Sequence, residues 1–436
     1  MQKNLIADTA TPHPTFAEAL RVWLKIGLLS FGGPAGQIAL MHKVLVDEKK
    51  WIDEPRYLSA LNFCMLLPGP EAMQLATYVG WRLHGLKGGL SAGLLFVLPG
   101  AFVMLALSMA YAAFGKLPLA EALFIGVKAA VLAIVVEALM RVAKRALKGN
   151  VDWMIAVLAF LAIFAFQVPF PIIVLAAALF GFWRGFGLKA TLPASAIVPV
   201  PMSQTLRTVA IWLAIWILPL LAIAMIFGGD HVLAKLALFF SKLAVVTFGG
   251  AYAVLAYMAQ DVVQTYNWLK PGEMLDALGL AETTPGPLIL VTEFVGYVAA
   301  HRFGGGSPVA MGILGAVVTI WATFAPCFLW IFAGAPYLER LNNEPRLKSA
   351  LAAVTAAVVG VILNLTVWFA LNVLFAKVNT VDAGPLHMLL PELGSANLRT
   401  FALSALAFAL LFALHRGIIT TLAICGGLAV VWHFVG

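Results

Sequence analysis

Two short stretches decide the fold: Ser30-Phe31-Gly32-Gly33-Pro34 and Pro68-Gly69-Pro70, each set within a run of apolar residues. Proline lacks a backbone amide donor and glycine permits unusual backbone angles, so a helix that contains either stretch should break there. The residue before each proline is also pushed toward extended geometry. Each stretch therefore predicts two half-helices. In a bilayer, backbone groups freed by a break must face protein or a cavity.

Both stretches recur later in the chain at a single offset of 217 residues. The first returns as Thr247-Phe248-Gly249-Gly250 and the second as Pro285-Gly286-Pro287. Trp51 returns as Trp268 at the same offset, and a slip of one residue then aligns Gly80 with Gly296. Ordered motifs that share one offset predict a duplicated chain.

The composition places this duplicated chain in a membrane. Of its 436 residues 62% are hydrophobic and 11% are charged, whereas about 25% are charged in a typical soluble domain. Apolar runs of about 20 residues predict helices rather than the short strands of an outer-membrane barrel. The net charge of +8 resides mostly between these runs, which favours cytoplasmic loops over nucleic-acid binding. We therefore expect an all-α polytopic membrane protein.

About thirteen transmembrane segments are expected, six in each half and an extra one at 208–228. We divide the chain into an N-terminal repeat (1–190), a linker with the extra helix (191–232) and a C-terminal repeat (233–436). Seven spans then separate equivalent helices. An odd number inverts the second repeat, whereas a surface location for 208–228 would leave the repeats parallel. The short segments in 151–186 and 399–435 form two pairs, either tilted or folded as hairpins that do not fully cross.

Orientation follows from the basic residues, which are enriched in cytoplasmic loops. An N-terminus inside the cell places Arg141, Lys144, Arg145 and most other basic loop residues in the cytoplasm. The same topology puts the first loop outside, against the rule. That loop carries Lys43, Lys49, Lys50 and Arg56.

Broken helices expose amides at half-helix N-termini, which attract anions through hydrogen bonds and the helix dipole. Inverted repeats with such breaks near the midplane are typical of secondary transporters. The alternative explanation of the glycines is close packing between helices. We expect a substrate site between the two kinds of break, with amides from the paired glycines and hydroxyls from Ser30 and Thr247. The candidate substrate-binding residues are Ser30, Gly32, Gly33, Pro34, Gln37, Pro68, Gly69, Pro70, Thr247, Gly249, Gly250, Pro285, Gly286 and Pro287.

Ionisable residues within apolar segments are costly and are therefore functional candidates. Glu71 directly follows the first Pro-Gly-Pro break, and Glu293 lies beyond the second. A bare carboxylate repels an oxyanion, so we expect these glutamates to carry a proton. Lys25 and Arg82 are the expected attractors of negative charge.

At these motifs the chain resembles the chromate ion transporter family in its long, two-domain form. The resemblance rests on Phe31 to Pro34 followed by Ala35 and Gln37, on Pro68 to Pro70 followed by Gly80, and on the second copies. It implies export of chromate, a tetrahedral dianion, across the bacterial cytoplasmic (inner) membrane, giving chromate resistance. The second copy departs from the first, because Ala251 replaces Pro34 and Leu288 replaces Glu71.

Other functions remain open at this stage. Sulfate or another oxyanion would suit the same site, and a channel would share the broken helices. An enzyme is disfavoured because the histidines form no ligand cluster, and the three scattered cysteines predict neither metal nor disulfide. We expect no catalytic residue and no cofactor. The sequence fits uniport as well as exchange for protons. It also fits a homodimer.

Overall fold

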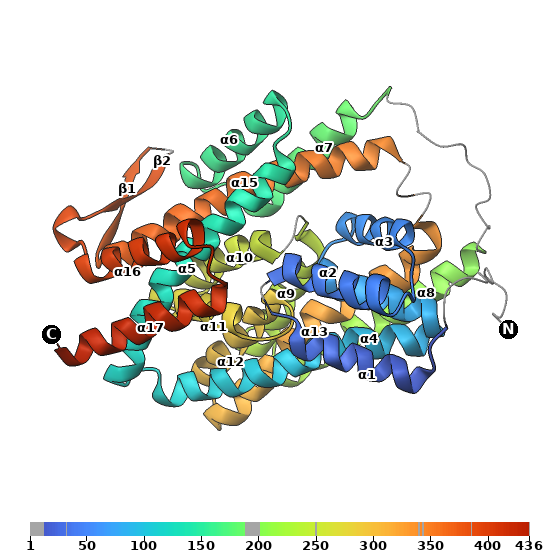
Figure 1. Cartoon of the computed structure of the whole chain (residues 1–436), viewed down its shortest axis with the longest axis horizontal. Helices are drawn as coiled ribbons and strands as arrows, with labels where there is room; N and C mark the ends of the chain where they lie inside the picture. The colour runs from blue at the N-terminus through green and yellow to red at the C-terminus, as the bar shows by residue number, and fades with distance from the viewer. Residues whose placement is uncertain are drawn as a thin grey trace.

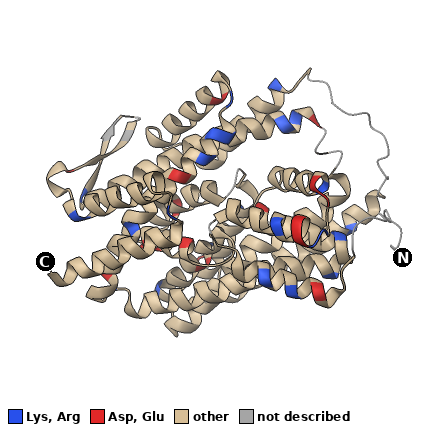
Figure 2. Ribbon diagram, viewed as in Figure 1, with Lys and Arg blue, Asp and Glu red and all other residues tan. Residues whose placement is uncertain are grey.

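The computed structural model describes all residues except 1–12, 32, 188–200, 249–250, 339–340, 342–343, 385 and 436. The described chain is helical apart from one β-hairpin, and its helices pack as a single bundle (Figure 1). Charged residues are sparse along the ribbon, most of which is tan in Figure 2. The expectation of an all-α polytopic membrane protein is confirmed.

Both Gly-Gly stretches break their helices. Helix α1 (Phe16–Leu29) ends before Ser30, and α2 (Gly33–His42) begins two residues after Phe31. In the second copy, α9 (Val232–Val246) ends before Thr247 and α10 (Ala251–Gln260) follows. Each second half-helix continues into a π-helical turn, η1 (Lys43–Glu48) or η2 (Asp261–Thr265). Lys50 and Asn267, 217 residues apart, follow these turns with nearly equal positive φ of 54° and 52°.

Both Pro-Gly-Pro stretches also separate helices. Helix α3 (Glu54–Leu66) ends just before the first stretch, and α4 (Glu71–Phe114) starts directly after it. Helix α11 (Pro271–Thr283) ends before the second stretch, which leads into η3 (Leu288–Leu290) and α12 (Val291–Phe303). The predicted breaks are confirmed at all four motifs.

Each Pro-Gly-Pro stretch leads into a tight helical hairpin. Helix α4 loses helical backbone angles at His84 and Gly85. Its two parts fold against each other, because Gly80 lies against the backbone of Gly88. In the second copy α12 packs in the same way on α13 (Pro308–Gly334), with Gly296 against Gly315. The sequence alignment of Gly80 with Gly296 therefore marks equivalent helix contacts.

In the described chain, the remaining helices are three long ones and two pairs of shorter ones. Helices α5 (Pro118–Ala146), α8 (Met202–Phe227) and α15 (Pro345–Leu374) are long and apolar. Shorter helices pair along them: α6 (Asn150–Phe164) with α7 (Phe170–Arg184), and α16 (Leu398–Phe408) with α17 (Ile418–Val435). The short elements are η4 (Ala335–Tyr337), β1 (Val378–Ala383), β2 (Leu386–Pro391), η5 (Leu393–Ser395) and η6 (Ala409–Ala413).

The count of thirteen spans is not reproduced. Within the described residues, 6 helices are long and apolar enough to cross a membrane. A helix of 10 to 15 residues such as α1, α2 or α3 covers only about 15–22 Å, against about 30 Å of hydrocarbon. Hydropathy alone could not distinguish a half-length helix that turns back from one that crosses.

Contacts between helix ends show where the half-helices of the first copy turn back. Lys49, after η1, forms an ion pair with Glu18 at the start of α1, with 2.8 Å between Nζ and Oε1. His13, before α1, stacks edge-on against His84 at the fold of α4. We call this side of the bundle the first end. The first loop, expected on the opposite side from the N-terminus, therefore lies beside α1's start, because α2 runs back toward it.

The second copy gathers its loops at the other side, the second end. There Arg302 at the close of α12 makes two hydrogen bonds, of 2.6 and 2.8 Å, to the Glu273 carboxylate at the start of α11. Helix α8 connects the two ends: Thr205 in its first turn bonds Tyr337 after α13, and Phe227 stacks on His231 before α9. The loops at the first end thus belong to half-helices of the first copy, and those at the second end to half-helices of the second copy.

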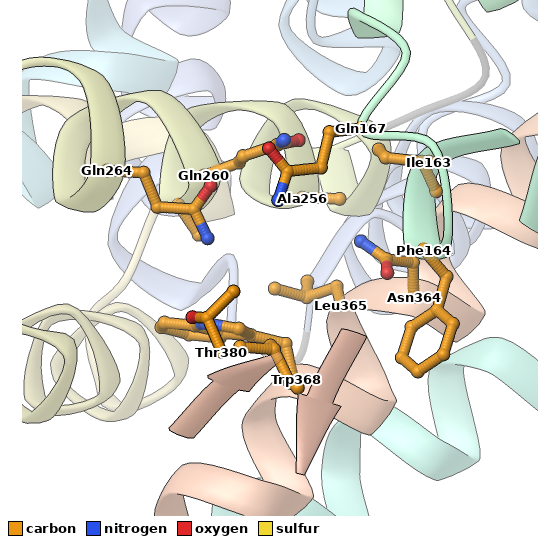
Figure 3. A pocket seen from close by; sticks show the side chains of 12 residues that line it. Ile163, Phe164, Gln167, Ala256, Gln260, Gln264, Asn364, Leu365, Trp368 and Thr380 are labelled. Carbon is orange, nitrogen blue, oxygen red and sulfur yellow. The ribbon is translucent and has the colours of Figure 1, made fainter. Parts of the chain in front are cut away.

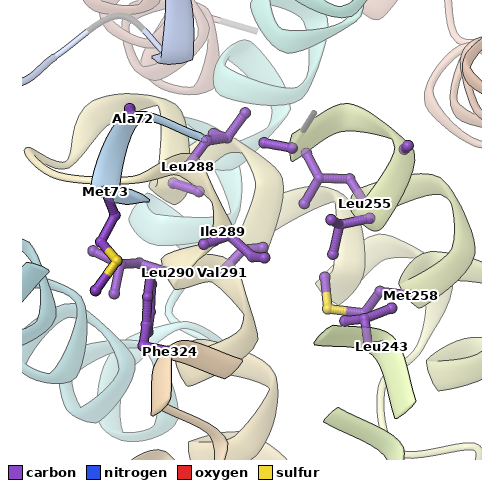
Figure 4. Close-up of a cluster of buried hydrophobic side chains, with 14 of the residues drawn as sticks. Ala72, Met73, Leu243, Leu255, Met258, Leu288, Ile289, Leu290, Val291 and Phe324 are labelled. Carbon is purple, nitrogen blue, oxygen red and sulfur yellow. The ribbon is translucent and has the colours of Figure 1, made fainter. Parts of the chain in front are cut away.

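The hydrophobic core surrounds the ends of these half-helices that lie inside the bundle. Figure 4 shows Leu288, Ile289, Leu290 and Val291 close to Leu255 and Met258 of α10. All six side chains are at most 3% exposed. The start of η3, where the second copy has Leu288 at the position of Glu71, is therefore packed in apolar surroundings.

Candidate functional site

The four helix breaks meet in crossed pairs inside the bundle. The amide of Gly286 donates to the carbonyl oxygen of Ser30 at 2.8 Å, and the amide of Gly69 donates to that of Thr247 at 3.0 Å. Each Pro-Gly-Pro stretch is thus bonded to the Gly-Gly break of the other copy, at equivalent positions. The bonds satisfy amides and carbonyls that the interrupted helices leave free.

The two glycines at these crossings have backbone angles that other residues rarely adopt. Gly69 has a φ of +109° and Gly286 a φ of +85°. A Cβ on Gly69 would also lie 3.1 Å from Gln74 Nε2 and 3.2 Å from Cys327 Sγ. The backbone conformation at Gly69 therefore favours glycine, and a Cβ there would displace the side chains of Gln74 and Cys327 slightly.

Buried glutamine side chains complete the arrangement. Gln37 of α2, 1% exposed, donates from Nε2 to the carbonyl oxygen of Gly286 at 2.6 Å. Gln74 of α4 donates from Nε2 to the carbonyl oxygen of Pro68 at 2.7 Å. Gln37 links the two copies, whereas Gln74 supports the turn of its own copy.

A cavity of about 150 Å³ lies beside this crossing, and the first turns of three helices line it. They are represented by Pro34 of α2, Glu71 of α4 and Tyr252 of α10. N-terminal turns present free amides and the positive end of a helix dipole. A cavity of this volume accommodates a molecule about the size of benzene. The other lining residues are Ala35, Ile38, Cys64, Met65, Leu67, Gly69, Ala138, Arg141, Val142, Arg145, Ala251 and Thr355.

Two arginines of α5 give the cavity its positive charge. Arg141 and Arg145 are one helical turn apart, so both side chains reach the same face. Arg141 is held by Glu137, with 2.6 Å between Nη2 and Oε1. Arg145 makes no ion pair within the described residues, and its Nη2 lies 2.7 Å from Met65 Sδ. A guanidinium presents several N–H donors in a plane that suits oxyanions.

Two glutamates lie at the cavity or next to it: Glu71 lines it, and Glu282 is bonded to Tyr252, which lines it. Glu71 Oε2 is buried without a hydrogen-bond partner among the described residues. Tyr252 donates from its hydroxyl to Glu282 Oε1 at 3.0 Å, while Glu282 Oε2 has no described partner. Each carboxyl group therefore has an oxygen free to bind a proton or a donor.

The structure brings together only part of the predicted site. Pro34, Gly69 and Glu71 line the cavity. The hydroxyls of Ser30 and Thr247 are buried and donate to carbonyl oxygens of their own helices, Ile26 at 2.6 Å and Leu243 at 2.5 Å. Gly32, Gly249 and Gly250 lie outside the described residues.

The remaining predicted residues lie around the breaks or away from them. Gly33 starts α2, Pro70 precedes α4, Pro285 lies against Gly100 and Pro287 precedes η3.

The predicted charge-bearing residues other than Glu71 do not line this cavity. Lys25 and Arg82 are exposed, on α1 and α4. Glu293 is 1% exposed within α12, and its Oε2 has no partner in the described part of the chain.

Sequence reasoning missed Arg141, Arg145 and Tyr252 as site residues. The arginines counted only as basic loop residues, although their spacing of four within a helix already indicated one face. Tyr252 stands where the first copy has Ala35, so the aligned copies marked it as a departure. Only the fold shows that α5 and α10 reach the same cavity.

Comparison with known proteins gives a consistent family. The family model described as chromate transporter matches residues 17–182 and 234–431, two regions that start 217 residues apart. The chromate transport protein of Pseudomonas aeruginosa is 35% identical over 362 residues, covering 81% of each chain. That of Cupriavidus metallidurans is 31% identical over 356 residues, covering 80% of this chain and 82% of that protein. An uncharacterized transporter of Methanocaldococcus jannaschii is 28% identical over 363 residues, covering 83% of this chain and 86% of that protein. No solved structure gives a significant match.

Proposed function

Because this chain belongs to the chromate transporter family, we propose that it exports chromate across the cytoplasmic membrane of a bacterium and so gives chromate resistance. The observation that carries this proposal is the cavity where Arg141 and Arg145 face the N-terminal turns of α2, α4 and α10. Amides, helix dipoles and guanidinium groups all favour a small anion. The two copies contribute to one cavity, as expected of a transporter built by duplication.

Substrate recognition would combine two kinds of donor. The first-turn amides lie on breaks fixed by the crossed hydrogen bonds of Gly69 and Gly286, so they are preorganised. The arginines come from α5, a separate helix. Movement of α5 relative to the breaks would therefore change the affinity for the anion, which is what alternating access requires.

We assign the first end to the cytoplasm, because that end carries most of the basic residues and cytoplasmic loops are enriched in Lys and Arg. Because α2 runs back toward the start of α1, the basic first loop lies on the cytoplasmic side in this assignment and no longer contradicts the rule. The inverted topology of the repeats is part of this proposal. Beside the contacts that define the first end lie Lys43, Lys49, Lys50, Arg56, Arg82 and Lys87, against Lys116, Lys235, Lys270 and Arg302 beside those of the second.

Export of a dianion is favoured by the membrane potential. Two negative charges that leave a cell with about 100 mV, negative inside, release about 4.6 kcal/mol. Glu71 lines the cavity and has an unpartnered oxygen, so we propose it as the proton carrier if a proton moves in exchange. Glu293, buried away from this cavity, is the second candidate.

The test compares Arg141→Ala and Arg145→Ala with Lys144→Ala, a neighbouring basic residue of α5 that does not line the cavity. Loss of a charge-assisted hydrogen bond should weaken binding about tenfold or more per arginine. Labelled chromate and labelled sulfate should be assayed separately, as accumulation in cells and as binding to purified protein.

Lower chromate accumulation with the wild type, lost with the arginine variants and kept with Lys144→Ala, is the expected result. A change in sulfate alone would keep the site and replace the substrate. Full chromate export by the double arginine variant would exclude this cavity as the site.

A further inference from the structure

A second cavity, of about 170 Å³, lies toward the second end of the bundle. Its polar lining is formed by four side-chain amides, from Gln167, Gln260, Gln264 and Asn364, together with Thr380 of the β-hairpin. Figure 3 shows Gln167, Gln260 and Gln264 on one side of the space and Thr380 and Trp368 on the other. None of the lining residues is charged.

These amides have unused hydrogen-bonding capacity. None of the four amide side chains bonds another residue in the described part of the chain; Gln167 and Gln264 are exposed, and Gln260 and Asn364 are partly buried. Each side-chain amide offers two N–H donors. Four such groups around one small space therefore make a neutral site for an acceptor-rich ligand.

The second cavity, which we call the amide cavity, lies along the same two helices, α10 and α15, as the cavity lined by Arg141 and Arg145, which we call the arginine cavity. Tyr252 lines the arginine cavity and Ala256 and Gln260 line the amide cavity, so successive turns of α10 serve both. On α15, Thr355 belongs to the first and Asn364 to the second, about 13 Å apart along the helix axis. Buried residues such as Val358 and Ile362 of α15 lie at the levels between them.

The arginine cavity is charged and the amide cavity is neutral, and this difference gives a direction to movement of an anion between them. In the first copy, the positions equivalent to Gln260 and Gln264 are Lys43 and Asp47, so the second copy has neutral amides in place of charges. A dianion bound by two arginines needs a weaker site through which to leave, since transport requires release as well as capture. Neutral amides provide hydrogen bonds without a fixed charge.

We propose that the amide cavity is a second, low-affinity site for the transported tetrahedral oxyanion, occupied on the release side after the arginine cavity. The proposal rests on the proposed function. In this site Gln260 and Asn364 contact the oxyanion directly. The β-hairpin covers the exit, with Thr380 facing the cavity.

Charge substitutions of opposite sign test the contact. Gln260→Lys and Gln260→Glu should be compared in membrane vesicles of both orientations, with labelled chromate presented at either face. From the second-end face, Gln260→Lys should lower the half-saturating concentration about tenfold and Gln260→Glu should raise it about tenfold, since each changes the interaction with a dianion. From the first-end face, the initial half-saturating concentration should stay within about twofold.

Two further variants separate contact from folding. Asn364→Asp, nearly isosteric and on another helix, should act in the same direction as Gln260→Glu. Gln204→Glu on α8, which lines neither cavity, should leave both faces unchanged. Equal effects of Lys and Glu, effects equal at both faces, or no effect would overturn the second site while wild-type transport still supports the proposed function. Absence of chromate uptake by the wild type from both faces would instead overturn the proposed function and, with it, this inference.

Discussion

Single residues hold the helix breaks in place, and Gly69 is the most constrained of them. Its amide donates to the other copy, its φ is +109°, and a Cβ would lie 3.1 Å from Gln74 Nε2. Sequence alone predicted that glycine opens the helix here. It could not predict that the same amide bonds Thr247, because that contact depends on how the two copies pack.

Replacement of Gly69 by alanine should therefore destabilise the protein. A left-handed backbone costs an L-residue about 1–2 kcal/mol, and the close neighbours add to that. Thermal unfolding in detergent, followed by tryptophan fluorescence, should give a lower midpoint than the wild type. Gly427→Ala is the matched control, since Gly427 lies in α17 with nothing within 4 Å of its Cβ position. An unchanged midpoint for Gly69→Ala would contradict the strain argument.

Among the elements, the half-helices determine how far sequence reasoning could go. Each break was predictable because proline and glycine act locally on the chain. Whether α2 crosses or turns back depends on its partners, such as the Lys49–Glu18 ion pair. The same limit explains Arg141 and Arg145. The sequence indicated them only as basic loop residues, and their position beside the breaks of α2 and α10 depends on how α5 packs.

The link between elements of different copies rests on Gln37. Its Nε2 is the described side-chain donor to the Gly286 carbonyl, at 2.6 Å in buried surroundings. Gln37→Met keeps the approximate shape and removes the donor, leaving a buried carbonyl with one bond fewer. We expect a loss of about 1–3 kcal/mol, visible as a lower unfolding midpoint, and reduced transport because α2 and the second break are no longer held together.

Gln204→Met, at an exposed site on α8, controls for the substitution itself. If Gln37→Met unfolded like Gln204→Met and transported at the wild-type rate, the bond would have no role in joining the copies.

For the whole molecule, the central feature is that the helix breaks of the two copies meet inside the bundle, and we propose that their half-helices enter it from opposite ends. The sequence predicted the duplication and, through an odd number of spans, its inversion. The number of thirteen spans is not confirmed, since 6 helices of the described chain are long and apolar enough to cross a membrane. Half-helices that turn back in pairs add no crossing and leave the parity of the count unchanged, so inversion of the second copy stays a prediction.

This arrangement predicts opposite accessibility of equivalent positions. Glu48 and Thr265 are 217 residues apart, both exposed, at the closing turns of η1 and η2. Cysteine at either position should react with a membrane-impermeant maleimide from one side only. The native cysteines Cys64, Cys327 and Cys425 are buried, so their background labelling should be low.

In intact cells we expect Thr265→Cys to be labelled and Glu48→Cys to be protected until the membrane is permeabilised, because the first end carries most of the basic residues and should face the cytoplasm. Labelling of both from the same side would refute inversion, and the reverse pattern would keep inversion but reverse the direction of the export path.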